Sequence, residues 1–217
     1  TFAYGKMNLV DKSSRSRNYI TGIRYGGSLL DNTLTNNTCV YKYDNVVYLD
    51  EKYGPISGLI LNGDVLKVFQ HSNVPSIYIG KAEMKMADGS SQWVVSDKLL
   101  AQTRPSTDNY GSSHIDSVID VNGSIYFWDQ RNGCPCKATS GGIFPLNGRV
   151  SNGVNATDLK MARAFEEISA NIKSNPNSKV VASYSKKHRL VSFSFVIING
   201  NREIEDSSMT LSFHEPT

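Results

Sequence analysis

The sequence has few cysteines, no long hydrophobic run and no large excess of charge of one sign. Three cysteines among 217 residues are too few for a disulfide-stapled scaffold. The longest apolar stretch, residues 190–198, is interrupted by serines and is far shorter than the roughly 20 residues of a membrane-spanning helix. The net charge of +3 disfavours a protein that binds nucleic acid through a basic face. We therefore expect neither a membrane nor a sequence-specific nucleic acid as a partner.

Motifs that mark common enzymes and cofactor sites are also missing. The chain has no Gly-rich phosphate loop, no dinucleotide fingerprint and no Gly-x-Ser-x-Gly elbow. Cys134 and Cys136 flank one proline, but Cys39 is remote and no second ligand pair has the spacing of a zinc site. We predict no metal, no cofactor, no disulfide between Cys134 and Cys136, and no enzymatic activity. A small-molecule ligand remains an open question.

The histidines do not form a metal or catalytic motif in the sequence. None of the four stands in a His-x-x-x-His setting, and they are His71, His114, His188 and His214. A Ser-His-Asp site stays open at this level, because the partners of a triad are far apart in the chain.

Most of the chain fits short β-strands that are separated by turn signals. Apolar residues make up 39% and aromatic residues 10%, which is typical of a folded protein. Strand-like stretches of β-branched and aromatic residues alternate with Gly, Asn, Asp, Pro and Ser. These stretches are residues 19–25, 39–43, 46–50, 56–61, 65–70, 76–79, 93–95, 117–121, 124–129, 136–140, 180–184, 190–198 and 209–214.

One segment has a helical period instead. Apolar residues recur every three or four positions over residues 158–173, which predicts an amphipathic helix of about four turns. Asn155 or Thr157 is the candidate cap at its start, and Asn175-Pro176 ends it. The apolar positions of this helix are Leu159, Ala162, Phe165, Ile168 and Ile172.

Short strands at this spacing indicate a sandwich, a barrel or a propeller. Residues 62–70 match residues 122–130 at one fixed offset, and this internal echo favours propeller blades. We expect a mainly β chain with propeller-like blade units over residues 39–147, a helical insertion at 155–175 and further antiparallel strands at 180–217. Because the sequence begins at Thr1 and stops soon after a strand-like run, we expect residues 1–217 to be one fragment of a longer chain.

Acidic and basic residues offer two further kinds of site. Asp116, Asp120 and Asp129 lie near Tyr126 and Trp128 in the sequence, and a glycosidase needs a carboxylate pair with sugar-stacking aromatics. Asp before a turn more often forms that turn, so we favour a structural role. Basic clusters at residues 12–17 and 186–189 are interpreted as solvated loops.

Several motifs in combination resemble a family of tail-associated structural proteins of crAss-like and related short-tailed bacteriophages. That family pairs a "KYGxI" segment with a "GDxLxVFQ" strand, here at residues 52–58 and 62–70. The resemblance covers most of residues 19–147 and the final strands. Its other matches are residues 110–111, 117–118, 123–129, 130–133, 140–143 and 210–215. Residues 185–189 depart from it, because a basic sequence replaces the acidic turn of the family's hairpin.

The resemblance implies a non-enzymatic virion protein of the muzzle or stabilization type, which forms a ring at the tail end. The expected partners are further copies of this chain and other tail proteins, and the expected location is the virion. The alternative is a carbohydrate-binding or glycoside-hydrolysing β-propeller of a gut bacterium. A clustered carboxylate pair beside an exposed tryptophan would favour that alternative, and the chain has only Trp93 and Trp128.

Overall fold

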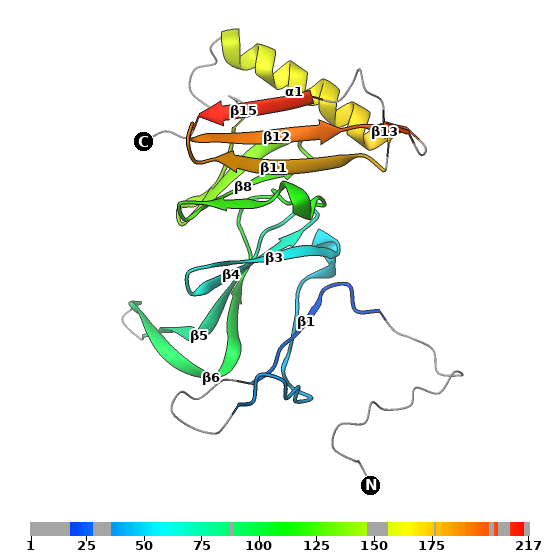
Figure 1. Ribbon diagram of the computed structural model, residues 1–217. Helices are drawn as coiled ribbons and strands as arrows, with labels where there is room; N and C mark the ends of the chain where they lie inside the picture. The colour runs from blue at the N-terminus through cyan, green and yellow to red at the C-terminus, as the bar shows by residue number, and fades with distance from the viewer. Residues whose placement is uncertain are drawn as a thin grey trace, which may run out of the picture.

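The computed structural model describes residues 18–27, 36–86, 89–146, 156–175, 177–199, 202–203 and 209–214 (Figure 1). Antiparallel strands dominate this part of the chain, which contains one α-helix, so the predicted mainly β fold with a single helix is confirmed. The strands are β1 (Gly22–Arg24), β2 (Val46–Tyr48), β3 (Ile56–Asn62), β4 (Val65–Gln70), β5 (Ser76–Lys85), β6 (Ser91–Arg104), β7 (Ile119–Val121), β8 (Ser124–Asp129), β9 (Cys134–Thr139), β10 (Gly142–Pro145), β11 (Lys179–Ser185), β12 (Leu190–Val196), β13 (Ile198–Asn199), β14 (Arg202–Glu203) and β15 (Met209–His214). The helix α1 spans Ala156–Ser174, and two 3-10 helices, η1 and η2, span Glu51–Tyr53 and Ile115–Ser117.

Two four-stranded sheets form the centre of the molecule. The first has the order β3-β4-β5-β6 and the second the order β10-β9-β8-β7, and neighbouring strands are antiparallel throughout. An up-and-down sheet of four strands is the topology of a propeller blade. Both sheets lie within residues 39–147, where the blade-like units were predicted.

The sheets are stacked face to face, and a hydrophobic core fills each space between them (Figure 1). Ile23 and Ile77 belong to the core between β1–β2 and the first sheet. Phe69 and Phe127 belong to the core between the two four-stranded sheets, and their ring centroids are 5.2 Å apart. Trp128 belongs to the third core, which the second sheet shares with α1 and the β11-β12-β15 sheet.

The central strands β4 and β8 are buried on both faces. Successive side chains of a strand point to opposite sides of the sheet. On β4, Val68 therefore enters the first core and Phe69 the second, and on β8, Phe127 enters the second core and Trp128 the third. This two-sided burial explains why residues 124–129 form an almost continuous apolar run instead of an alternating one.

The helix α1 has the predicted amphipathic character and is slightly longer than predicted. Phe165, Ile168 and Ile172 are all buried in the third core, as their spacing predicts. The side chains of Leu159 and Ala162 lie outside the described residues.

The predicted N-terminal cap of α1 is only partly tested. Asn155 lies outside the described residues, and Thr157 lies inside the first turn of the helix. Thr157 therefore does not occupy the cap position that precedes the first helical residue.

The C-terminal half of α1 contacts the turn between β8 and β9. Ser169 Oγ donates a hydrogen bond to the carbonyl of Gln130 at 3.4 Å, and Lys173 Nζ donates to the carbonyl of Arg131 at 3.1 Å. Gly133 has a φ of +63°, and a Cβ at this position would lie 2.7 Å from the Cβ of Ser169. The turn approaches the helix so closely that only glycine fits there.

The internal echo places its two copies in equivalent hairpins, but one residue out of register. Asn62 pairs with Val65 in the first sheet, whereas Val121 pairs with Ser124 in the second. The structural offset between the sheets is therefore 59, not the 60 of the sequence match. A shift of one residue moves every side chain of a strand to the other face.

The segment 39–43 was predicted as a strand and is not one. It contains only turn and irregular backbone, and its large side chains are exposed, with Tyr43 at 96%. The prediction rested on the apolar residues of this segment, and in the structure these residues do not pack against a sheet. In contrast, β5 and β6 are much longer than the predicted 76–79 and 93–95.

Candidate functional site

The histidines lie in separate places and do not form a common site. His71 Nδ1 is 2.5 Å from Ser113 Oγ on an exposed surface, and His188 lies in the exposed turn between β11 and β12. His114 is half-buried next to η2, and burial lowers the pKa of its imidazole. The side chain of His214 is outside the described residues. Among the described residues, no group of three or more His, Cys, Asp or Glu is placed to hold a metal.

The two neighbouring cysteines face the core between the two four-stranded sheets. Cys134 and Cys136 are buried and free, with their sulfur atoms 3.8 Å apart, and Cys39 is exposed. Burial raises the pKa of the Cys136 thiol well above its usual value. Thiols in such an environment are poor nucleophiles, because the reactive species is the thiolate.

Two of the three aspartates that lie near Trp128 in the sequence, Asp120 and Asp129, accept hydrogen bonds from the backbone of the turns that follow them. Asp116 and Asp120 are exposed, and Asp120 Oδ1 accepts a hydrogen bond from Gly123 N at 3.2 Å in the β7–β8 turn. Asp129 is fully buried, and its Oδ1 accepts from the backbone N–H of Arg131 at 2.8 Å. Burial raises the pKa of Asp129, and hydrogen bonds from the following turn partly oppose that shift.

The aromatic partners that a sugar site needs are not beside these aspartates. Trp128 is 0% exposed and is enclosed by Phe165 and Phe195. Trp93 is 47% exposed, but it lies on β6, in the other four-stranded sheet. The pattern of a carboxylate pair with an exposed tryptophan is therefore not assembled by the described residues.

Of the two basic clusters, residues 12–17 lie outside the described residues. Residues 186–189 form the exposed turn between β11 and β12, and Arg189 has a φ of +52°. This position agrees with the interpretation as a solvated loop.

The motif residues of the sequence resemblance contact one another through a buried polar network. Gln70 is fully buried at the end of β4, and its Nε2 donates to the carbonyls of Asp50 at 3.1 Å and Gly54 at 2.8 Å. These two carbonyls flank η1, so the side chain of Gln70 holds the turn of the "KYG" segment against the sheet. Gly54 has a φ of +85°, which explains glycine in this turn.

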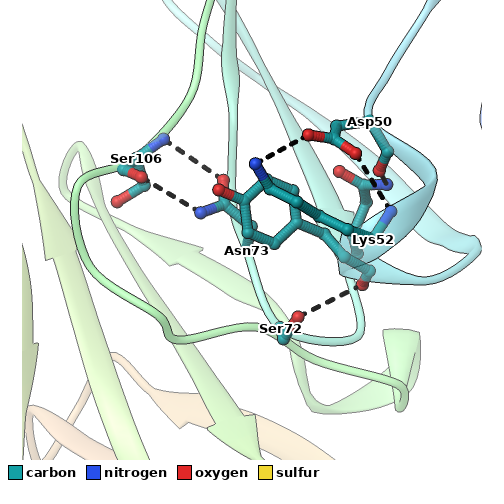
Figure 2. A network of polar contacts seen from close by, with 7 residues as sticks. Asp50, Lys52, Ser72, Asn73 and Ser106 are labelled. Carbon is teal, nitrogen blue, oxygen red and sulfur yellow. Dashed lines mark hydrogen bonds and ion pairs between the residues drawn. The ribbon is translucent and has the colours of Figure 1, made fainter.

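The connection between β4 and β5 extends this network (Figure 2). The side chain of Asn73 donates to the carbonyl of Ser106 at 3.0 Å and accepts from the backbone N–H of Ser106 at 3.2 Å. Ser72 Oγ donates to the carbonyl of Tyr53 at 3.4 Å, and Lys52 Nζ lies 2.8 Å from Asp50 Oδ2. The network joins η1, the β4–β5 connection and the segment after β6.

The outer part of the β5–β6 hairpin forms a separate exposed surface. We call it the arm and define it as residues 81–86 and 89–95. The arm begins where Gly80, with a φ of +63°, faces the extra residues 96–99 of β6. β4 pairs with β5 only up to Tyr78, and no other described strand pairs with the arm. The arm is therefore a two-stranded ribbon that projects from the first sheet (Figure 1).

The two faces of the arm differ in the side chains that β5 contributes to them. On β5, Lys81, Glu83 and Lys85 point to one face, and apolar residues point to the other, because side chains alternate along a strand. Met84, Met86 and Val94 on or beside the apolar face are 52%, 42% and 38% exposed. Apolar side chains thus form a surface that the described part of the chain does not cover.

Contacts at its base hold the arm in a defined orientation. Arg104 forms an ion pair with Glu83, and the backbone N–H of Glu83 donates to Gln102 Oε1 at 2.8 Å. The rings of Tyr78 and Trp93 have centroids 4.5 Å apart. The arm is therefore fixed against the sheet at its base while its apolar face stays open.

The arm was not predicted from the sequence, although residues 81–86 have the alternating pattern of a strand. Residues 81–86 alternate charged and apolar side chains, which is the period of a half-buried strand. This alternation predicts that the strand continues past residue 79 and has one face to cover.

No helix in the described part of the chain is long and apolar enough to cross a membrane. A comparison with models of known protein families finds no match, and a comparison with curated proteins finds none.

Proposed function

We propose that this chain is a non-enzymatic structural protein of a bacteriophage tail, of the muzzle or stabilization type, and that it assembles with further copies of itself. The arm carries the proposal, because its shape and apolar face fit an assembly contact. The sequence resemblance, which covers most of residues 19–147 and the final strands, supports the assignment to a phage tail.

The physical argument begins with the stability of the arm. A two-stranded hairpin alone is at best marginally stable in water. This ribbon also exposes Met84, Met86 and Val94, and no described strand pairs with either of its edges. Unpaired edges and apolar faces favour association with another chain, because both are satisfied by strand addition or by packing.

The first sheet offers a matching surface on its opposite edge. β3 is the edge strand there, and Leu59 and Leu61 on it are 47% and 58% exposed. Both side chains point to the same face of β3, since they are two residues apart. An arm at one edge and an apolar strand at the other allow head-to-tail contacts between identical chains. Such heterologous contacts generate a ring when the rotation between copies closes.

Sedimentation velocity over a range of concentrations tests self-assembly. We expect the unmodified chain to form oligomers, and we expect the double variant Met84→Lys, Val94→Lys to remain monomeric with an unchanged circular dichroism spectrum. Val181→Lys is the matched control, because Val181 is 40% exposed on β11, outside the arm. A chain that stays monomeric at every concentration, or a double variant that associates like the control, refutes the assembly contact.

The virion assignment needs a separate test. Antibodies against the chain should label purified phage particles at the tail end in negative-stain electron microscopy. Absence of the chain from the particles, or hydrolysis of a glycan that Asp129→Asn abolishes in a folded protein, would overturn the structural role.

A further inference from the structure

A hydroxyl-lined groove separates the two four-stranded sheets beside their core. Its larger compartment has a volume of about 420 Å³, within the roughly 300–1,000 Å³ of small-molecule sites. A second compartment of about 230 Å³ continues from it and shares the same central residues. One wall comes from β4 and β5, and the other from the end of β9 and the turn that follows it.

Lys67 has an unusual position in this groove. It lies on the central strand β4 directly opposite Ile60, which packs on the core between the sheets, and cross-strand partners share a face. Its side chain therefore points toward the second sheet. The structurally equivalent residue of the second sheet, at the offset of 59, is Tyr126, which is 2% exposed in a hydrophobic core. A lysine thus occupies a position where the other sheet has a buried aromatic ring.

The charge of Lys67 has no carboxylate partner within 4.0 Å among the described residues. Its Nζ donates a hydrogen bond to Ser76 Oγ at 2.7 Å, and an ammonium group has three donors. Burial lowers the pKa of Lys67, because partial removal from water disfavours the charged form. A half-buried cation with donors to spare is stabilised by an anionic ligand.

The remaining lining of the larger compartment is neutral and rich in hydrogen-bonding groups. It combines one amide, several hydroxyl groups, the phenol of a tyrosine and a few apolar or glycine positions. These residues are Asn62, Val65, Ser76, Tyr78, Gly123, Ser124, Ala138, Thr139 and Ser140. Among the residues that the structure describes, Lys67 is the only charged one that lines this compartment.

Two other charged residues line the smaller compartment only. Arg104 forms an ion pair with Glu83, which neutralises its charge. Asp108 Oδ2 accepts a hydrogen bond from the backbone N–H of Ile143 at 3.3 Å. We therefore expect an anion to bind at Lys67 in the larger compartment, which Asp108 does not line.

We propose that this groove binds a small anionic sugar, either a sugar acid or a sugar phosphate, with its oxyanion on Lys67 and its hydroxyl groups on the serine, threonine and asparagine lining. The oxyanion accepts from the free donors of Lys67 Nζ. Hydroxyl groups of the sugar both donate and accept, as the neutral lining requires. This site is distinct from the arm and does not depend on the assembly role.

Isothermal titration of the full chain with four probes tests the site. The probes are D-glucuronate, D-glucose 6-phosphate, neutral D-glucose and inorganic phosphate. We expect saturable binding of at least one of the two anionic sugars, and the stronger of the two identifies the oxyanion. Glucose and inorganic phosphate should bind at least about 10-fold more weakly, because each lacks half of the recognised chemistry.

Variants of Lys67 make the test specific. Lys67→Met and Lys67→Gln should each weaken binding of the anionic sugar by about 10- to 100-fold, the equivalent of one charge-assisted hydrogen bond. Both should stay folded by circular dichroism, because Lys67 has no carboxylate partner and its hydrogen-bond partner, Ser76 Oγ, is only half-buried. Lys179→Met on the exposed face of β11 is the control and should bind like the unmodified chain.

Three results overturn the proposal. They are the absence of saturable binding by both anionic sugars, equal binding of glucose or inorganic phosphate, and unchanged affinity in the folded Lys67 variants.

Discussion

Replacing Trp128 tests whether one side chain joins the second sheet, α1 and the third sheet. The indole is 0% exposed, and its ring centroid lies 5.8 Å from that of Phe165 on α1 and 4.8 Å from that of Phe195 on β12. Truncating a buried tryptophan to alanine costs about 3–5 kcal/mol, from lost apolar burial and from the cavity that remains. Because domain stabilities are about 5–15 kcal/mol, Trp128→Ala should remove a large part of the free energy of unfolding.

A phenylalanine at the same position separates packing from hydrogen bonding. The indole Nε1–H of Trp128 is buried and has no acceptor among the described residues. Trp128→Phe keeps an aromatic ring between α1 and β12. It also removes that unpaired donor, and this gain offsets part of the free-energy cost of the lost side-chain volume. We expect a cost of only about 1–2 kcal/mol for this variant.

Urea unfolding followed by far-ultraviolet circular dichroism measures both variants. Trp93→Phe is the control and should change stability by less than about 0.5 kcal/mol, because Trp93 is 47% exposed. Fluorescence adds a second readout. The emission of Trp128 alone, in the Trp93→Phe variant, should shift strongly to the red on unfolding, and that of Trp93 alone should shift little. A cost below about 1 kcal/mol for Trp128→Ala, or equal costs for the alanine and phenylalanine variants, refutes the reasoning.

Three further predictions concern the polar network, a glycine and a histidine. Asn73→Ala should lower the unfolding free energy by about 1–3 kcal/mol in urea titrations, because it leaves three backbone groups of the segment after β6 without their partner. Gly111→Ala should lower the melting temperature, since its Cβ would lie 2.3 Å from the carbonyl oxygen of Gln70, whereas Gly141→Ala, with its nearest side-chain atom at 3.8 Å, should change it little. Burial lowers the pKa of His114 below 6.5, so the unfolded chain binds the proton more readily, and stability should fall as the pH drops below about 6.5. A pH series of urea midpoints checks this, and His114→Gln should remove that component. An identical pH dependence in the variant would contradict the assignment to His114, and a stability that rises as the pH drops would contradict its sign.

Local features of the fold followed from the sequence where the cause is itself local. The helix over 158–173 was predicted because apolar residues repeat at the helical period, and this periodicity is a property of neighbouring residues. The tight turn at Asn122-Gly123 also has a local cause, because an Asn-Gly pair favours positive φ angles, and both residues have them, +51° and +80°. Strand β8 was recognised from its aromatic and β-branched run.

The candidate sites were harder to predict from the sequence, because they depend on which element packs against a side chain. The alternation in residues 81–86 predicts a strand with one apolar face, but only the structure shows that no described element covers that face. Conversely, the apolar residues of 39–43 resembled a strand but have no sheet to pair with. The echo between the two hairpins was visible, yet its register depends on cross-strand pairing.

The sequence by itself determined the fold class and the helix over 158–173, because backbone preferences and short-range periodicity decide these features. Only the tertiary structure decided which core receives Phe127 and which receives Trp128, and that Lys67 points into the space between two sheets. A strand presents two faces that are equivalent along the chain, and the choice between them is made by the layer that packs on each face. For the same reason a lysine that looks like an ordinary surface residue in the sequence becomes a half-buried cation in a groove once the second sheet is stacked on the first.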